Sequence, residues 1–210
     1  MKIKIIGLML LLIAPASHAE SNLNDKNSIF WQSLYPSGGI TLFCNQTFSR
    51  KSNRLTAGYI YSLKAVREEL QCRTNTECKR DSELYRAVLT DLHNTYPIMT
   101  RVELKRRDTV FGNVRGEANP LLPNCSLQED YLVLEPADAI KGDIARALLY
   151  IHDQYNLPLQ APLETLIEWN SIDKPDDQEV ERNNTIADLQ GIRNRFIDDP
   201  ALAAQLASRE

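Results

Sequence analysis

A short stretch in the middle of the chain combines several residue types that could do chemistry. Residues 91–97 read DLHNTYP and contain one of only three histidines in the protein. The amide oxygen of Asn94 is a hard donor that suits Mg²⁺, which prefers oxygen ligands. A basic cluster that could hold phosphate groups follows it and consists of Arg101, Lys105, Arg106 and Arg107. The alternative is an ordinary helix end, because Pro97 stands where prolines commonly follow a helix.

The elements that would position this stretch can be read from the apolar pattern. Residues 83–92 predict a helix, with apolar residues repeating every fourth position. Residues 40–44 and 55–61 are rich in β-branched and aromatic residues between polar turns, which predicts two strands that could form a hairpin. Residues 29–35 predict a short amphipathic helix. Asn94 is therefore expected at the end of a helix, with a strand pair before it.

The second half of the chain is predicted to be mostly helical. Residues 113–128 are loop-like, and residues 131–135 predict a short strand. A helix beginning at Pro136 is expected to be packed on the core, because apolar residues follow one face of it. Further helices are predicted over residues 162–169 and 177–193. The fold class predicted from this order is α+β, a mostly helical single domain.

The first 19 residues are typical of a secretory signal peptide. An apolar run follows two lysines and ends in a small-x-small cleavage pattern after Ala19. We therefore predict a signal peptide over residues 1–19, a polar leader over 20–28 and one domain over 29–210. No later segment is long and apolar enough to span a bilayer. We expect a periplasmic or secreted protein that does not enter the membrane and acts as a monomer.

The four cysteines are the second set of residues with defined chemistry. An even number of cysteines in an exported chain favours disulfides. Cys72 and Cys78 lie close enough in sequence for a local disulfide, which leaves Cys44 to pair with Cys125. A zinc site is the alternative, but the C-x₂-C pairs typical of such sites are absent. The spacing thus predicts the disulfides Cys72–Cys78 and Cys44–Cys125.

The charges are unevenly distributed along the chain. Without Lys2 and Lys4 of the signal peptide, 22 Lys and Arg stand against 28 Asp and Glu. Residues 50–115 contain 14 cationic and 8 anionic residues, whereas residues 116–210 contain 7 and 18. This distribution indicates one part that faces a polyanion and another that is solvated. The competing interpretation is that both charged parts simply face water.

Several sequence blocks, taken together, resemble one known family. In order, they are FWQSLYP (30–36), FC (43–44), DLHN (91–94) with YP (96–97), KGDIARA (141–147), WN (169–170) with Asp173, and RN (182–183) followed by QG, RN and FI up to residue 197. These blocks and the cysteine positions resemble the bacterial periplasmic and secreted endonuclease I group, which are ββα-metal (His-Me finger) nucleases. The resemblance covers nearly all of the mature chain.

The resemblance implies a site made by a β-hairpin and a helix. In the family, the strand carries a Glu-His pair within the pattern LNxEHVYP, and the asparagine of the DLHN block binds the metal with that glutamate. It thus implies a ββα-metal core, Mg²⁺ as cofactor, Asn94 as a metal ligand, and DNA or RNA as the substrate. Residues 55–62 align with the strand without a gap. Gly58 then stands at the glutamate position and Tyr59 at the position of the general-base histidine.

These two replacements suggest two functional hypotheses. A tyrosine, with an ordinary pKa near ~10, is a poor base at neutral pH, and loss of general-base catalysis costs about 10²- to 10⁴-fold in rate. Gly58 also removes an anionic ligand, which would weaken metal binding. The first hypothesis is an endonuclease I-like enzyme that hydrolyses DNA or RNA without sequence preference and is impaired here. The alternative is an inactive pseudonuclease that binds nucleic acid or a protein as an exported module.

Overall fold

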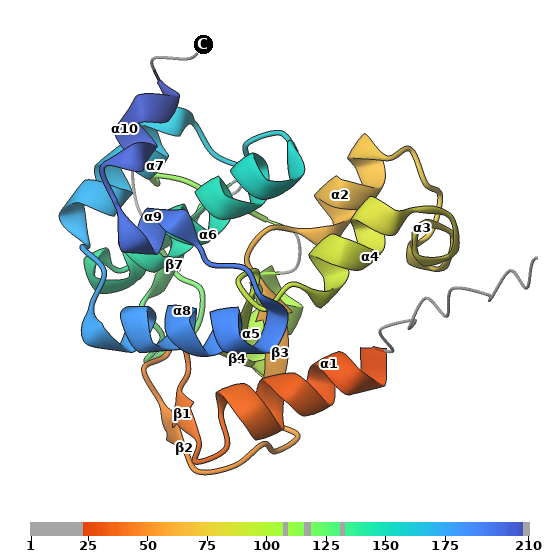
Figure 1. The fold of residues 1–210 in the computed structure, drawn as a ribbon. Coiled ribbons are helices and arrows are strands. Elements are labelled where there is room, and N and C mark those ends of the chain that lie inside the picture. Colours follow the sequence, from red (N-terminus) through yellow and green to blue (C-terminus); the bar gives the residue numbers. More distant parts are fainter. Residues whose placement is uncertain (1–22, 107–108, 116–118, 131–132, 208–210) are drawn as a thin grey trace, which may run out of the picture.

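The computed structural model describes residues 23–106, 109–115, 119–130 and 133–207, and it shows an α+β domain dominated by helices (Figure 1). The helices are α1 (Leu23–Ile29), the π-helical turn η1 (Phe30–Leu34), α2 (Leu63–Glu69), α3 (Asn75–Asp81), α4 (Glu83–Thr90), α5 (Thr100–Arg106), α6 (Asp138–Tyr155), α7 (Leu163–Ile172), α8 (Asp177–Gln190), α9 (Arg195–Asp198) and α10 (Leu202–Leu206). The strands are β1 (Gly39–Ile40), β2 (Thr47–Phe48), β3 (Leu55–Tyr59), β4 (Thr95–Met99), β5 (Val110–Phe111), β6 (Asn119–Pro120), β7 (Leu127–Glu129) and β8 (Val133–Pro136). Within the described residues, no helix combines the length and the apolar character needed to cross a membrane.

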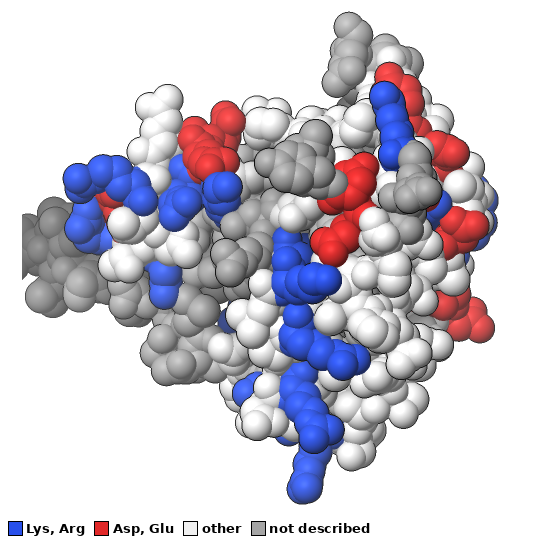
Figure 2. Space-filling view, turned by 180° about the vertical axis from the view of Figure 1, so that it is seen from behind, with Lys and Arg blue, Asp and Glu red and all other residues white. Residues whose placement is uncertain are grey.

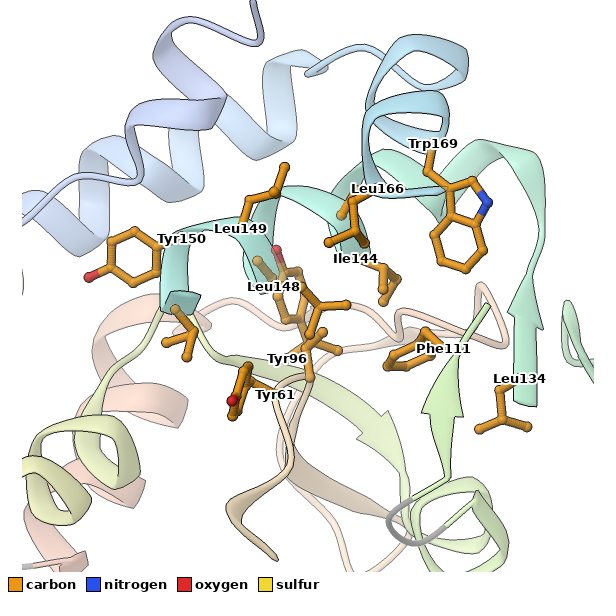
Figure 3. Packing of buried hydrophobic residues seen from close by; sticks show 14 of the residues in the cluster. Tyr61, Tyr96, Phe111, Leu134, Ile144, Leu148, Leu149, Tyr150, Leu166 and Trp169 are labelled. Carbon is orange, nitrogen blue, oxygen red and sulfur yellow. The ribbon is translucent and has the colours of Figure 1, made fainter. Parts of the chain in front are cut away.

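The core lies beneath α6, the longest helix. The apolar face predicted for this helix is confirmed, because Ile144, Leu148 and Ile151 are buried. Figure 3 shows side chains from α6 and α7 gathered with side chains from β4, β5 and β8. Trp169 of α7 is fully buried in this core. The apolar residues that recur with helical spacing in the sequence therefore predicted correctly which face of α6 packs on the core.

The strand pairing differs from the predicted one. β3 pairs antiparallel with β4, from Leu55 opposite Met99 to Tyr59 opposite Thr95, whereas β1 pairs with β2. The hairpin expected between residues 40–44 and 55–61 is therefore wrong. The strand β4 was missed because it contains Pro97, and a proline lacks the N–H that a central strand requires. It is tolerated here because β4 pairs with one strand only.

Strands β3 and β4 and helix α5 form a strand–strand–helix unit. The backbone N–H of Thr100, the first residue of α5, donates to the carbonyl of Arg54 just before β3, with 2.8 Å between nitrogen and oxygen. Since α5 follows β4 directly and contacts both strands, it lies across the β3–β4 pair. Residues 100–106 were predicted only as a basic cluster, so this helix was not expected from the sequence.

A buried arginine ties α6 to α7 and α8. Arg146 is fully buried and forms an ion pair with Glu179 of α8, with Nε and Oε1 2.9 Å apart. It also donates to the side chain of Asn170 and to the carbonyl of Asp173. Gly142 lets the helices approach, because a Cβ there would lie 2.0 Å from the Asp173 carbonyl oxygen. Packing and ion pairing thus explain Gly142 and Arg146 of the block KGDIARA.

Both predicted disulfides are present. Cys44 is bonded to Cys125 across 81 residues of sequence, and Cys72 is bonded to Cys78 across 6 residues. The first links the region after β1 to the segment before β7, which packs on the core. The second closes the turn between α2 and α3. The described residues contain no free cysteine.

We predict that the two disulfides differ in their contribution to stability. Loop-closure entropy gives about 4.5 kcal/mol for the long loop and about 2 kcal/mol for the short one. Cys44→Ala/Cys125→Ala should therefore lower the free energy of unfolding more than Cys72→Ala/Cys78→Ala, as measured by urea denaturation. An equal or reversed order would contradict this prediction.

Candidate functional site

A carboxylate from α5 occupies the space beside Gly58 of β3, where a side chain of residue 58 would lie. A Cβ built on Gly58 would lie 2.5 Å from Ile98 Cδ1 and 2.8 Å from Glu103 Oε2. Both distances are shorter than a normal contact, so a side chain at residue 58 would displace Glu103 or Ile98. Within the strand–strand–helix unit, the acidic group at this position therefore comes from the helix and not from the strand.

This carboxylate forms an ion pair with a buried arginine. Arg106 Nε lies 2.8 Å from Glu103 Oε2, one helical turn apart on α5, and the arginine side chain is 4% exposed. Arg106 also donates to the backbone carbonyl of Tyr59. Its guanidinium lies 5.7 Å from the ring centres of Phe43 and Phe111. Arg106 thus neutralises Glu103 and ties α5 to the end of β3.

A small cavity opens at this ion pair. Its volume is about 190 Å³, and its polar lining includes Ser62, Glu103, Arg106 and Gln160. The backbone N–H of Ser62 donates to Gln160 Oε1 at 2.9 Å. The cavity therefore places an acidic, a cationic and an amide side chain side by side next to β3.

The side chain of Tyr59 lies on the other face of the β3–β4 pair from this ion pair. Side chains alternate along a strand, so Tyr59 and Gly58 project in opposite directions. The Tyr59 hydroxyl donates to the carbonyl of Leu89 at 3.1 Å. Burial is the main cause that raises the pKa of Tyr59 above its ordinary value. The Tyr59 hydroxyl is therefore protonated and already donates a hydrogen bond. Both properties disfavour its action as a general base, the role that the resemblance assigns to this position.

The N-terminal helix covers Tyr59 with a lysine. Lys26 Nζ lies 4.1 Å from the centre of the Tyr59 ring and donates to the Leu89 carbonyl at 2.7 Å and to Thr95 Oγ1 at 2.8 Å. Burial lowers the pKa of Lys26 to about 7, against the nearby charge of Asp91. Lys26 lies in the segment 20–28 that was predicted to be a polar leader, but the residue is buried and belongs to α1.

Asn94 follows α4 but lies outside it. The helix ends at Thr90, and Asn94 occupies the turn before β4, so the expected position on the helix is wrong. Its Oδ1 accepts from the backbone N–H of Tyr61 at 2.7 Å, and its Nδ2 donates to the Tyr61 carbonyl at 3.1 Å. The residue is fully buried. The amide therefore fastens the chain after β3 to the turn before β4.

The neighbouring Asp91 and His93 stabilise the same turn. The Asp91 carboxylate accepts from the hydroxyls of Tyr150 at 2.8 Å and Tyr155 at 2.7 Å, and also from Gln190 and the His93 backbone N–H. The His93 ring packs against Tyr150, and its Nε2 lies 2.9 Å from the Ile192 carbonyl oxygen. Burial lowers the pKa of His93 to about 4, against the charge of Asp91. The imidazole is thus neutral and structural.

The residues present do not fit the Mg²⁺ site that the resemblance implies. The described residues contain no group of three or more His, Cys, Asp or Glu side chains arranged to hold a metal ion. The carboxylate of Glu103 is neutralised by Arg106, and both polar atoms of the Asn94 amide bind backbone groups. Metal binding by Asn94 therefore stays a prediction from the sequence, and the described residues offer no set of acidic ligands to complete a site with its neutral amide.

The predicted nucleic-acid-binding cluster divides into exposed and buried members. Arg101 and Lys105 are exposed on α5, one turn apart, whereas Arg106 is buried. Lys105 also lies 3.2 Å from Glu129. Arg107 falls outside the described residues. Figure 2 shows a line of Lys and Arg side chains on this face of the molecule.

Two residues of the site were missed in the sequence. Glu103 was counted among the charges of a basic segment, although its spacing of three from Arg106 indicates a helical ion pair. Nothing in the sequence indicated that Lys26 is buried, because a lone lysine in a polar segment is usually solvated.

Comparison with known proteins identifies relatives over most of the chain. The sequence profile of the family described as Endonuclease I matches residues 67–201, which include β4 and α5. An extracellular deoxyribonuclease of Aeromonas hydrophila is 31% identical over 193 residues, 79% of this chain and 83% of the relative. A periplasmic deoxyribonuclease of the same organism is 30% identical over 223 residues, 92% of each chain. An extracellular ribonuclease of Bacillus amyloliquefaciens is 32% identical over 136 residues, 56% of this chain and 46% of the relative.

We predict that Asn94→Ala destabilises the protein by about 2–4 kcal/mol, because the backbone N–H and carbonyl of Tyr61 would lose their buried partners. The free energy of unfolding from urea denaturation measures this effect. Asn53→Ala, at an exposed position outside the helices, is the control and should change stability by less than about 0.5 kcal/mol. A change at Asn94 no larger than that of the control would show that the amide does not hold the turn.

We predict that His93 weakens the fold in mild acid. Its pKa is about 4 in the folded protein and 6.5 ordinarily, so between these values the unfolded chain binds more protons. The free energy of unfolding should therefore fall as the pH drops from about 6.5 towards 4, and the His93 contribution is fully present above 6.5. His93→Gln should flatten this part of the pH profile, whereas His152→Gln should retain it. Parallel profiles for wild type and His93→Gln would refute the assignment.

Proposed function

This chain belongs to the endonuclease I family, and we propose that it binds nucleic acid through cationic surfaces while hydrolysing phosphodiester bonds weakly or not at all. The ion pair between Glu103 and Arg106, which takes up the space beside Gly58, carries this proposal. We propose that β3, β4 and α5 correspond to the ββα-metal unit of the family. In this chain an internal guanidinium occupies the environment in which a divalent cation would act.

Two catalytic contributions are weakened by this arrangement. General-base catalysis is worth about 10²- to 10⁴-fold, and the protonated, covered Tyr59 cannot supply it. A divalent cation would stabilise the charge that develops on the phosphoryl oxygens, but its anionic ligand is missing at Gly58. These two losses support the proposal that cleavage is impaired, and they leave binding to phosphate groups unaffected.

The cationic surfaces that support binding lie on one face of the molecule (Figure 2). We call the first the α5 surface; its exposed members are Arg50, Lys51, Arg54, Arg101 and Lys105. Apart from Lys105, none of these has an ion-pair partner among the described residues. Arg54 and Arg101 line one groove with the exposed Leu104. Such unpaired cations release counterions when they contact phosphates, which gives affinity without sequence preference.

The second cationic surface lies on α2, α3 and α4, and we call it the α2–α4 surface. Its residues are Lys64, Arg67, Arg73, Lys79, Arg80 and Arg86. Three of them form ion pairs with acidic neighbours, so this surface is less strongly positive. The 190 Å³ cavity lies between the two surfaces, because Ser62 and Leu63 at the start of α2 and Arg106 of α5 all line it. A strand that contacts both surfaces would cross the Glu103–Arg106 pair.

The identity of the nucleic acid and the cellular location are proposed from the relatives. Their names include both deoxyribonucleases and a ribonuclease, so we propose DNA or RNA as the partner. The names also include extracellular and periplasmic proteins, which agrees with the signal peptide expected over residues 1–19. We therefore propose that this chain acts in the periplasm or outside the cell.

The competing function is a metal-dependent nuclease with a relocated ligand. One observation favours it: Glu103 Oε2 lies within 2.8 Å of the point where a side chain of residue 58 would begin. In that case Glu103 would exchange Arg106 for a metal ion when nucleic acid binds. The two proposed functions predict different effects on DNA cleavage when the Glu103 carboxylate is removed.

We predict that the wild-type protein nicks plasmid DNA in magnesium no faster than in chelator. Gly58→Glu/Tyr59→His/Glu103→Ala/Arg106→Ala restores the missing groups and removes both members of the ion pair, so it should cleave at least about 10²-fold faster than wild type. Glu103→Ala alone is the control. Strong cleavage by wild type that chelator and Glu103→Ala both abolish would establish the competing nuclease instead.

We predict that the α5 surface dominates binding. Arg54→Ala/Arg101→Ala should weaken binding to a labelled duplex and reduce the slope of log K against log salt by about 2, because two phosphate contacts are lost. Fluorescence anisotropy over a salt series measures both quantities. Lys174→Ala, at an exposed cation outside both surfaces, should leave the slope unchanged. Equal effects at the two sites would argue against a defined binding surface.

A further inference from the structure

A larger cleft lies away from the Glu103–Arg106 pair. It has a volume of about 520 Å³ and is bordered by the β1–β2 hairpin, the first turns of α6 and the first half of α8. Both α8 and the hairpin lie at the front in Figure 1, on the side opposite to the face drawn in Figure 2. This volume is in the range that small organic ligands occupy in proteins. Neither the proposed binding surfaces nor the site beside Gly58 uses this cleft.

The wall of the cleft is acidic. Four carboxylates line it, those of Asp143, Asp176, Glu179 and Glu181, together with one guanidinium, that of Arg182. Glu179 is already paired with Arg146. Arg182 donates to the carbonyls of Leu92 and Thr95 and lies 4.0 Å from the ring centre of Tyr96. The excess negative charge disfavours nucleic acid and favours a positively charged occupant.

Asp143 is the unusual member of this wall. Its carboxylate forms no hydrogen bond or ion pair with any described residue, although the residue is partly buried on α6. Burial, together with the nearby Glu179, raises the pKa of Asp143 well above its ordinary value. The charge of Arg146 opposes this rise in pKa, but no hydrogen bond from a described residue satisfies the carboxylate. A carboxylate that is partly withdrawn from water and has no donor can gain hydrogen bonds from a group that enters the cleft.

The chemistry of the cleft narrows the choice of ligand. A divalent metal is disfavoured, because the described residues offer no group of three or more potential ligands. The aromatic and aliphatic residues Tyr35, Tyr96, Leu42 and Phe43 also line the cleft. A carboxylate beside aromatic and aliphatic walls suits a cation that carries N–H donors on an apolar body.

We propose that this cleft binds an organic cation, whose guanidinium, amidinium or ammonium group donates to the Asp143 carboxylate while its apolar part lies against Tyr35 and Tyr96. This site is independent of the proposed nucleic-acid binding. The cationic group has two possible sources, a free polyamine-like molecule or a Lys or Arg side chain of a partner protein. The same carboxylate would recognise either source.

Isothermal titration calorimetry of the full mature chain with benzamidine tests the proposal. Benzamidine should bind with a stoichiometry of one, whereas benzamide, which has the same shape and no charge, should not. Asp143→Asn should weaken benzamidine binding at least tenfold, and Asp138→Asn, an exposed carboxylate on the same helix outside the cleft, should not change it. Parallel titrations with spermidine and with an end-blocked Gly-Arg-Gly peptide then identify the source by the tighter binder.

A second pair of variants keeps the test decisive if Asp143→Asn does not fold. Ala139 is exposed, lines the cleft and precedes Asp143 by four residues on α6, so Ala139→Lys would bring an ammonium group to the carboxylate. Ala139→Lys should raise the melting temperature and abolish benzamidine binding, whereas Ala139→Gln should do neither. Equal binding of benzamidine and benzamide, or wild-type benzamidine affinity in Ala139→Lys or Asp143→Asn, would overturn the proposal.

Discussion

The ion pair between Glu103 and Arg106 is the interaction on which the account of this protein depends. It lies where α5 crosses β3, beside a glycine whose missing side chain leaves room for it. Arg106 is nearly fully buried and also holds the Tyr59 carbonyl, so the pair joins the helix to the strand. A buried charge that loses its partner is strongly destabilising, so neither residue is free to exchange its partner for a metal at low cost.

The rest of the scaffold holds this unit in place through buried polar contacts. Asn94 fastens the end of β3 to the turn before β4, and Asp91 ties the same turn to two tyrosines of α6. Arg146 in turn fixes α6 to α8. Residues in the sequence blocks that resemble the endonuclease I family therefore have structural roles here.

Much of the fold could be predicted from the sequence, but the site could not. The period of α6 and the cysteine spacing identified the core helix and both disulfides, because each depends on local pattern or on few alternatives. The pairing of β3 with β4 joins segments about forty residues apart, and Pro97 concealed the second strand. Glu103 lies beside Gly58, and Lys26 lies over the ring of Tyr59. Both contacts join residues far apart in the sequence, so no local sequence pattern indicates them.

Direct titration with a paramagnetic divalent ion tests the central claim, that an internal ion pair takes the place of the metal. Mn²⁺ binds oxygen ligands as Mg²⁺ does, and electron paramagnetic resonance reports its free concentration. The account predicts no saturable Mn²⁺ site in the wild-type protein. Stoichiometric Mn²⁺ binding by wild type that Glu103→Ala abolishes would contradict it.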